Sequence, residues 1–145
     1  HRDLHSFPTR RSSDLHDGYR YRKNYKKLPG SPDIAITKYK LALFCDSEFF
    51  HGKDWDKLKV RLERGKNPQY WIRHIEENME RDRRVDRELA LLDWTVIRFW
   101  SNDIKKDLQG CLRFIEETVF DSAMARGSLL IKTGIINAAS KIRAA

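Results

Sequence analysis

The sequence lacks the features that would place this protein in a membrane or outside the cell. It has only two cysteines, Cys45 and Cys111, and they do not form the paired spacing of a metal site or a disulfide framework. No apolar run approaches the roughly 18 residues that a membrane-spanning helix needs. The first residues also lack the apolar stretch of a signal peptide. We therefore expect a cytoplasmic protein in a reducing compartment.

Basic charge, in contrast, is abundant. The chain has 29 Lys and Arg residues against 21 Asp and Glu residues, which gives a formal net charge of +8 at pH 7. Basic side chains displace the counterions that condense on nucleic acid, so this excess favours a polyanionic partner. Charge alone does not identify that partner, because Lys and Arg also keep many proteins soluble. With 145 residues, 40% of them hydrophobic, the chain is expected to form one compact domain.

The first 15 residues stand apart from the rest of the sequence. The segment HRDLHSFPTRRSSDL has no sustained hydrophobic period and contains a proline. It resembles the in-frame translation of a short-read sequencing adapter, which indicates a metagenomic gene fragment whose own start was replaced. We therefore expect the native chain to begin near His16 and leave residues 1–15 out of the fold prediction. A disordered N-terminal arm is the alternative interpretation.

Hydrophobic periodicity divides the remaining chain into strands and helices. Strands are predicted within 18–25, 33–36, 39–44 and 95–100. Helices are predicted over 54–65, 68–92 and about 102–119, with Asn67 as N-cap and Pro68 at the first position of the second helix. This order predicts an α/β domain over residues 16–121. Residues 122–145 form a tail that is compatible with a further amphipathic helix.

An acid interrupts the apolar face of the predicted helix 68–92. Residues at steps of three or four form one inward stripe, made up of Trp71, Ile75, Met79, Asp82, Val85, Leu89 and Leu92. A carboxylate on such a face must be paired, since burying an unpaired charge costs several kcal/mol, roughly. Two roles fit Asp82. It either forms a structural salt bridge, to a neighbouring arginine or to one on a strand, or it takes part in catalysis.

Other candidate groups lie where the predicted strands begin and end. Asp33 precedes one strand, and the next strand ends at Cys45 and Asp46. Adjacent strands bring such ends together, and Mg²⁺ prefers carboxylate and carbonyl oxygens. His51 lies just beyond, and an imidazole oriented by a carboxylate such as Asp82 acts as a general base near neutral pH. Taken singly, Asp33 is more often a turn residue and His51 an inert surface histidine.

Two adjacent aromatic residues follow the acidic strand end. Phe49 and Phe50 would point to opposite faces of an extended chain, so at most one of them naturally enters the core. The other either packs in a small loop cluster or serves as a wedge that enters a base stack. Trp71, beside Tyr70, allows the same two interpretations.

Taken together, four segments resemble the very short patch repair (Vsr-type) endonucleases: LPGSPDIAI, YKLALFCDSEFFHG, QYWIRHIEENMERDRRVDREL and WTVIRFW. They cover about residues 28–100. The resemblance implies a restriction-endonuclease-like fold, in which helices flank a mixed central β-sheet. It also implies a bacterial, Mg²⁺-dependent DNA-repair enzyme that acts as a monomer. Its substrate would be double-stranded DNA, which it would nick 5′ of the thymine in a T:G mismatch.

The resemblance also implies roles for individual residues. Asp33 resembles the central metal-binding aspartate, and Cys45 occupies the position that contributes a metal-binding backbone carbonyl. His51 resembles the catalytic histidine, and Asp82 the aspartate that orients it. The positions of the aromatic residues that intercalate beside the mismatch are filled by Phe49, Phe50 and Trp71. Basic residues that could neutralise phosphates are Arg20, Arg22, Lys23, Arg81, Arg83 and Arg84.

The sequence departs from the family pattern in three places. Asp46 stands where some members have a histidine, and would add a carboxylate to the metal site. No structural zinc is expected, because the positions near the family's zinc ligands hold Glu48, Lys53, Trp55 and Asn102. The family's N-terminal helix, with an acidic residue near the metal, should lie before Gly18 and is missing. The chain as given would be inactive if that acid is required.

Three functional hypotheses remain open at this point. The first is a strand-specific, Mg²⁺-dependent mismatch nickase. The second is a related nuclease of the same fold that has no mismatch preference. The third is a non-catalytic DNA-binding domain, in which the acids serve only the structure.

Overall fold

The computed structural model describes the backbone of residues 19–143 and the side chains of residues 19–125. The segment 1–15, with its expected adapter origin, and the expected position of an N-terminal helix before Gly18 lie outside the described residues. Among the described residues, none of the helices combines the length and apolar character that a bilayer-spanning segment requires.

The described part of the chain contains one mixed sheet with the strand order β1-β2-β3-β4. The strands are β1 (Arg22–Lys23), β2 (Ile34–Ile36), β3 (Leu41–Asp46) and β4 (Thr95–Trp100). β2 runs antiparallel to both β1 and β3, whereas β3 and β4 are parallel. A parallel pair needs a crossover connection, and helices α1 (Trp55–Glu63) and α2 (Pro68–Leu91) provide it. α3 (Ser101–Lys106) and α4 (Leu108–Arg143) follow β4.

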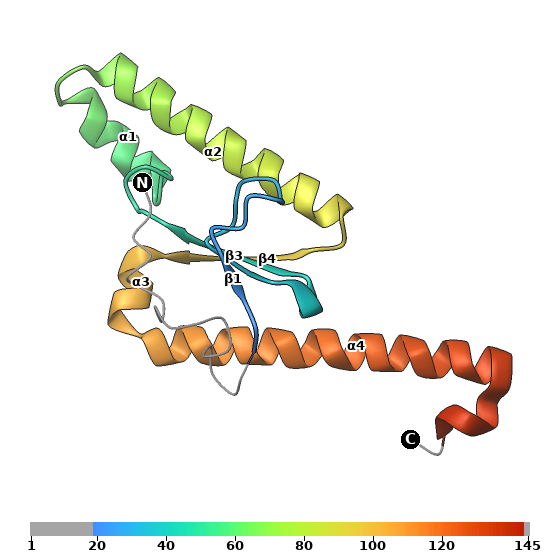
Figure 1. The fold of residues 1–145 in the computed structure, drawn as a ribbon. Coiled ribbons are helices and arrows are strands. Elements are labelled where there is room, and N and C mark those ends of the chain that lie inside the picture. The colour runs from blue at the N-terminus through green and yellow to red at the C-terminus, as the bar shows by residue number, and fades with distance from the viewer. Residues whose placement is uncertain (1–18, 144–145) are drawn as a thin grey trace.

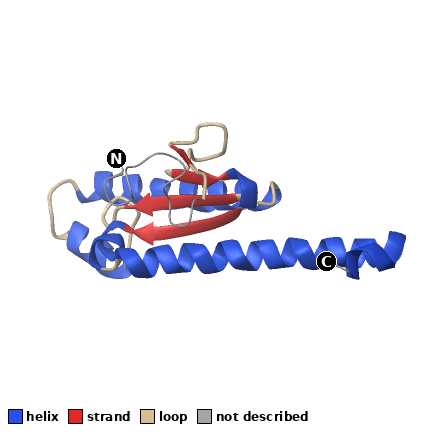
Figure 2. Cartoon of the chain, turned by 60° about the horizontal axis from the view of Figure 1, so that its bottom comes forward, coloured by secondary structure: helices blue, strands red, loops and turns tan. Residues whose placement is uncertain are grey.

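Helices cover both faces of the sheet, α2 on one side and α4 on the other (Figures 1 and 2). The side chains of β3 alternate between these layers, as the pleat requires. Leu41, Leu43 and Cys45 pack with α3 and α4, whereas Ala42 and Phe44 pack with α2. A strand buried on both faces reads as a continuous apolar run, which explains the segment LALFC. The mixed α/β fold predicted from the sequence is confirmed.

The central strand lies two residues later than predicted. Residues 37–39 form a short 3-10 turn, η2 (Thr37–Tyr39), and Lys40 then adopts a left-handed backbone conformation with a φ of 52°. Pairing with β4 carries the strand through Cys45 and Asp46, which face Phe99 and Trp100. Both residues therefore lie at the end of the strand, as expected.

The C-terminal helical region also differs from the prediction. The expected helix from Asn102 to about Val119 is two helices, α3 and α4, separated at Asp107. Asn102 lies inside α3, whose N-cap position is Trp100. α4 continues through residue 122 to Arg143, so the expected tail helix is the end of a longer one.

Helix α2 begins at Pro68 as expected, but two details differ. Asn67 occupies the N-cap position without a side-chain capping bond. The inward stripe of α2 ends at Leu89, because Leu92 is half exposed, and it also includes the buried Asn78.

We expect the contact between α2 and the sheet to contribute strongly to stability. Leu89 is fully buried, whereas Leu91, two residues along the same helix, is 85% exposed. Leu89→Ala should lower the free energy of unfolding by about 2–5 kcal/mol, because the sheet cannot close over the cavity. Leu91→Ala should change it by less than about 0.5 kcal/mol. Urea denaturation of the two variants measures both values, and equal losses would contradict the assigned orientation of α2.

Candidate active site

The loop between β3 and α1, residues 47–54, carries His51 and is fixed against α2. Asn78 of α2 donates a hydrogen bond from Nδ2 to the backbone carbonyl of Phe50, at 3.0 Å. Gly52 has a φ of +71°, and a Cβ at this position would collide with the side chain of Met79. The backbone of Gly52 therefore lies close to α2, and a larger residue here would be strained at this φ and would displace the Met79 side chain. This approach brings the neighbouring His51 onto the helix.

His51 and Asp82 form a close pair at this contact. Nδ1 of His51 lies 2.5 Å from Oδ2 of Asp82, and their side chains are only 9% and 16% exposed. Burial raises the pKa of Asp82. The hydrogen bond with His51 and the charges of His51 and Arg98 lower it, and together they outweigh burial, so the pKa of Asp82 lies below its ordinary value. An ionised Asp82 accepts the Nδ1 proton and leaves Nε2 as the reactive ring nitrogen.

Asp46, the last residue of β3, faces the other nitrogen of the imidazole. Its Oδ1 lies 3.8 Å from Nε2 of His51, and its Oδ2 accepts a hydrogen bond from Nη1 of Arg98 at 2.9 Å. Oδ1 is buried, and it has no hydrogen-bond partner among the residues that the structure describes. A buried carboxylate oxygen without a partner is unfavourable, and a bound cation would satisfy it.

Asp46, His51 and Asp82 together offer ligand atoms that all lie within 4.8 Å of one another. They line a cavity of about 180 Å³, whose other walls come from α2 and from the end of β4. The three residues thus form a compact group that could hold a divalent metal ion.

Asp33 lies beside this group but is not a member of it. Its Oδ2 accepts a hydrogen bond from the backbone N–H of Cys45 at 2.7 Å, and the residue is buried. Ile34 pairs with Leu43, so the antiparallel register places Asp33 opposite Phe44, on the α2 side of the sheet. Asp33 is therefore held one residue along β3 from Asp46. The thiol of Cys45 packs in the core on the opposite side, so only its backbone is near the site.

The cavity contains two charged residues that the sequence pattern does not single out, Arg98 and Asp86. Arg98, in the middle of β4, donates to Asp86 from Nε and Nη2 at 2.9 and 2.7 Å. Burial lowers the pKa of Arg98. Its bonds to Asp86 and Asp46 raise the pKa and outweigh burial, so the pKa lies above its ordinary value and Arg98 stays charged. The signal in the sequence is a lone arginine within the aromatic and β-branched strand TVIRFW. Such a residue needs buried acidic partners, but the sequence does not name them.

Of the two kinds of structural partner suggested for Asp82, the arginine on a strand is the one that approaches it. The arginine that approaches Asp82 lies on a strand: Nη1 of Arg98 is 3.8 Å from Oδ1 of Asp82. The neighbouring arginines of α2 bind elsewhere, since Arg81 donates to Asn78 and Arg83 to Glu80. Asp82 therefore takes part in an ion-pair network and also contacts the histidine. The two interpretations of its sequence position are compatible.

An exposed aromatic cluster adjoins the His51 loop. Phe49 and Phe50 are each 38% exposed, so neither enters the core. Their ring centroids lie 5.2 Å apart, and the Phe49 ring lies 5.4 Å from that of Trp71. Tyr70 stacks on His74 and extends the cluster along α2. We refer to Phe49, Phe50, Tyr70, Trp71 and His74 as the aromatic cluster.

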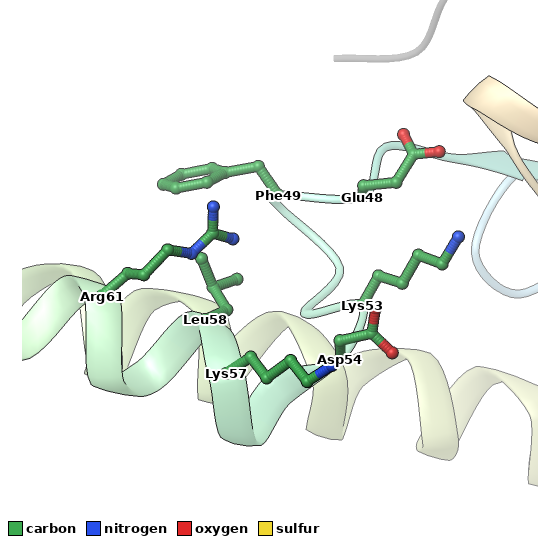
Figure 3. Close-up of a pocket in the computed structure, with 7 residues that line it drawn as sticks. All are labelled: Glu48, Phe49, Lys53, Asp54, Lys57, Leu58 and Arg61. Atoms are coloured by element: carbon green, nitrogen blue, oxygen red, sulfur yellow. The ribbon is translucent and has the colours of Figure 1, made fainter.

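Basic side chains line two open hollows of the surface, one of them beside the His51 loop. Lys53, Lys57 and Arg61 line an open hollow of about 620 Å³ between the loop and α1, and Arg61 reaches toward Phe49 (Figure 3). Arg20, Arg22 and Lys23 line a second hollow of about 850 Å³ at β1. Arg81, Arg83 and Arg84 flank Asp82 on α2 and are exposed.

Comparison with known proteins assigns the family. A family model described as DNA mismatch endonuclease Vsr matches residues 11–57. The chain is 43% identical over 104 residues to the type II nicking enzyme V.NmeDIP of Neisseria meningitidis serogroup C, an alignment that covers 72% of this chain and 69% of that protein. The chain belongs to the Vsr family. It is thus a DNA endonuclease, and the resemblance found in the sequence is confirmed.

Two further Vsr-family relatives support the assignment. The chain is 39% identical over 104 residues to the type II nicking enzyme V.HpaIIP of Haemophilus parainfluenzae, with 72% of each chain covered. It is 32% identical over 83 residues to the DNA mismatch endonuclease Vsr of Escherichia coli (strain K12), with 57% of this chain and 51% of that protein covered.

In this Vsr-family chain, polar contacts join the His51 loop to α3. Glu48 accepts hydrogen bonds from the Ser101 hydroxyl and from the Asn102 backbone N–H, both at 2.8 Å. The ammonium group of Lys53 lies over the Trp100 ring, 5.7 Å from its centroid. Three of the four positions expected near the family's zinc ligands thus take part in contacts between protein groups.

Substituting Gly52 tests whether its close approach positions His51. Gly52→Ala should lower the free energy of unfolding by about 1–3 kcal/mol, because alanine is strained at positive φ and collides with Met79. Nicking activity should fall by more than the loss of folded protein alone would cause, because His51 moves away from Asp82 in the molecules that remain folded.

Gly65→Ala is the matched control, since a Cβ there would meet only two backbone oxygens, at 3.6 and 3.7 Å. Its stability should change by less than about 0.5 kcal/mol. Urea denaturation and a plasmid-nicking assay provide the two measurements. A Gly52→Ala variant with unaltered activity would contradict the positioning role.

Proposed function

We propose that this endonuclease nicks double-stranded DNA at T:G mismatches in a Mg²⁺-dependent reaction. The observation that supports it best is the His51–Asp82 pair beside the unpartnered Oδ1 of Asp46, next to the exposed aromatic cluster. All three groups come from one chain, so the site needs no second copy, which supports a monomeric enzyme.

The donor atoms present suit a hard divalent cation. Asp46 supplies an unpartnered oxygen, and Asp33 brings a second carboxylate to the backbone of Cys45. Mg²⁺ prefers carboxylate and carbonyl oxygens, so Asp33, Asp46 and the Cys45 carbonyl would hold it. When bound, the cation polarises the phosphoryl oxygen and lowers the pKa of the attacking water.

His51 is the proposed general base. With its Nδ1 proton held by Asp82, Nε2 accepts a proton from the water that attacks phosphorus, and the P–O bond to the leaving oxygen breaks. The imidazolium that forms is stabilised by the ionised Asp82, as general acid–base catalysis requires.

The aromatic cluster is the proposed mismatch reader. Opening a base stack costs least where the pair is already mismatched, so an enzyme that inserts Phe49, Phe50 and Trp71 would favour such sites. The proposed phosphate contacts come from basic side chains on both sides of the site. They are Arg20 before β1, Arg22 on β1, and Arg81, Arg83 and Arg84 on α2. On α1 they include Arg61, which reaches toward Phe49 (Figure 3).

One alternative remains a candidate, a nuclease of this fold without mismatch preference. Two of the relatives described above are named type II nicking enzymes, and those names specify no mismatch. The non-catalytic DNA-binding hypothesis is disfavoured by membership of an endonuclease family.

Matched oligonucleotide duplexes distinguish the two nuclease hypotheses. We expect the T:G duplex to be nicked in one strand in the presence of Mg²⁺, the T:A duplex to be cut much more slowly, and EDTA to abolish both reactions. Denaturing gel electrophoresis of end-labelled strands measures the rates. Equal cleavage of both duplexes would favour the nuclease without mismatch preference.

Two variants test the assigned roles in the same assay. His51→Ala should reduce the rate by about 100-fold or more, because the general base is lost. Asp33→Asn should cause a comparable loss, because it removes a metal-binding charge while retaining an oxygen for the Cys45 N–H. Asp56→Asn, at an exposed acid of α1, is the charge-matched control and should leave the rate unchanged. An Asp33→Asn variant with wild-type activity would exclude Asp33 from the metal site.

The aromatic cluster makes a separate prediction about binding. Phe50→Ala and Trp71→Ala should each weaken binding to the T:G duplex by about 1–3 kcal/mol, because base stacking is lost, and should weaken binding to the T:A duplex less. Fluorescence anisotropy in EDTA measures binding without cleavage. Phe120→Ala, at a 62% exposed phenylalanine of α4, is the control. Equal losses on both duplexes would show that the cluster does not read the mismatch.

A further inference from the structure

We propose that Arg98 is a positioning residue of this active site. In this proposal its guanidinium, anchored on Asp86, orients Asp46 so that the unpartnered Oδ1 faces His51 and the bound cation. The inference deepens the proposed metal-dependent reaction and rests on it.

The sheet fixes where the Arg98 side chain begins and which way it extends. Arg98 pairs with Phe44 in the parallel register of β3 and β4, and its guanidinium carbon lies 4.2 Å from the centroid of the Phe44 ring. A guanidinium stacked on an aromatic face is restricted in position and in the orientation of its plane. The donors of Arg98 are therefore held at the end of β3 that carries Asp46.

Arg98 uses its donors on two carboxylates from different elements. Nε and Nη2 form a forked contact with Asp86 on α2, and Nη1 donates to Oδ2 of Asp46 on β3. Nη2 also lies 3.5 Å from the backbone carbonyl of Asp82. One rigid group thus connects the proposed metal-binding carboxylate with the helix that orients His51.

The two carboxylate oxygens of Asp46 have different surroundings, and this difference is why the contact with Arg98 matters for metal binding. Arg98 binds Oδ2, so the carboxylate has a defined rotation. Within the described part of the chain, Oδ1 then has no hydrogen-bond partner, and it lies 3.8 Å from Nε2 of His51. A simpler role for Arg98 would be charge balance alone, because Asp46, Asp82 and Asp86 would otherwise repel one another. The two roles differ in what they predict for a lysine, which keeps the charge but lacks the fork.

The lysine substitution is the decisive variant. A lysine ammonium in place of the guanidinium cannot bind Asp86 through two parallel donors and Asp46 through a third in this geometry. Outer partners of metal ligands typically contribute 10–100-fold to metal affinity or activity. We therefore expect Arg98→Lys to weaken Mn²⁺ binding by about tenfold or more. In nicking assays kcat should fall while KM for DNA stays within about threefold, because the DNA-binding side chains are untouched.

Mn²⁺ serves as the probe, because the EPR signal of the free ion reports binding to the full chain without DNA or turnover. Asp86→Asn provides a second variant that keeps Arg98 and Asp46 intact and removes only the charged anchor. It should weaken Mn²⁺ binding to a smaller extent than Arg98→Lys. Glu88→Gln removes the same charge from an exposed position two residues away on α2, and should leave Mn²⁺ binding unchanged. Thermal unfolding of each variant confirms that the fold is retained.

The possible outcomes separate this inference from the proposed function. Wild-type Mn²⁺ affinity in Arg98→Lys, together with tighter binding in Arg98→Met, would show charge balance alone and overturn the positioning role while metal-dependent nicking stands. Weaker Mn²⁺ binding in Arg98→Lys supports the positioning role even if the wild-type chain fails to nick the T:G duplex. A wild-type chain that binds no Mn²⁺ would overturn both.

Discussion

The site depends on the burial of one carboxylate, that of Asp46, at the end of a strand covered on both faces. A charge removed from water must be compensated by close partners, because its desolvation is expensive in a medium of low dielectric constant. Arg98 compensates one oxygen of Asp46, and His51 lies near the other. These partners come from β4 and from the loop before α1, so three segments of the chain meet around this one side chain.

Much of the fold follows from local sequence patterns. The strand at 95–100 is predicted to the residue, because its β-branched and aromatic run has clear ends, and α2 begins at the predicted proline. The central strand is displaced because a continuous apolar run does not show where pairing begins. The left-handed conformation of Lys40 and the pairing with β4 determine where this strand begins and ends. The prediction that Asn102 caps the next helix is wrong for a similar reason. Glu48, which is far away in sequence, accepts a hydrogen bond from the backbone N–H of Asn102.

The site shows the same division between local and distant information. Asp82 stands out as an acid in an apolar helical stripe, and the structure does place His51 against it. Asp33 and Cys45 are expected to meet across adjacent strands, and a hydrogen bond joins them. The contacts among Arg98, Asp46 and Asp86 depend on the parallel register of two strands and on the rotation of α2 about its axis. Neither is encoded in any short stretch of the chain.

The attachments of the His51 loop have a mechanical consequence. The loop is fastened to α3 through Glu48, to α2 through the Phe50 carbonyl, and to Asp82 through the imidazole itself. These three anchor points restrict how the Phe49 and Phe50 rings can move relative to the imidazole of His51. In the proposed reaction, a nucleobase that displaced Phe49 or Phe50 would therefore also displace His51, because one short loop carries all three side chains.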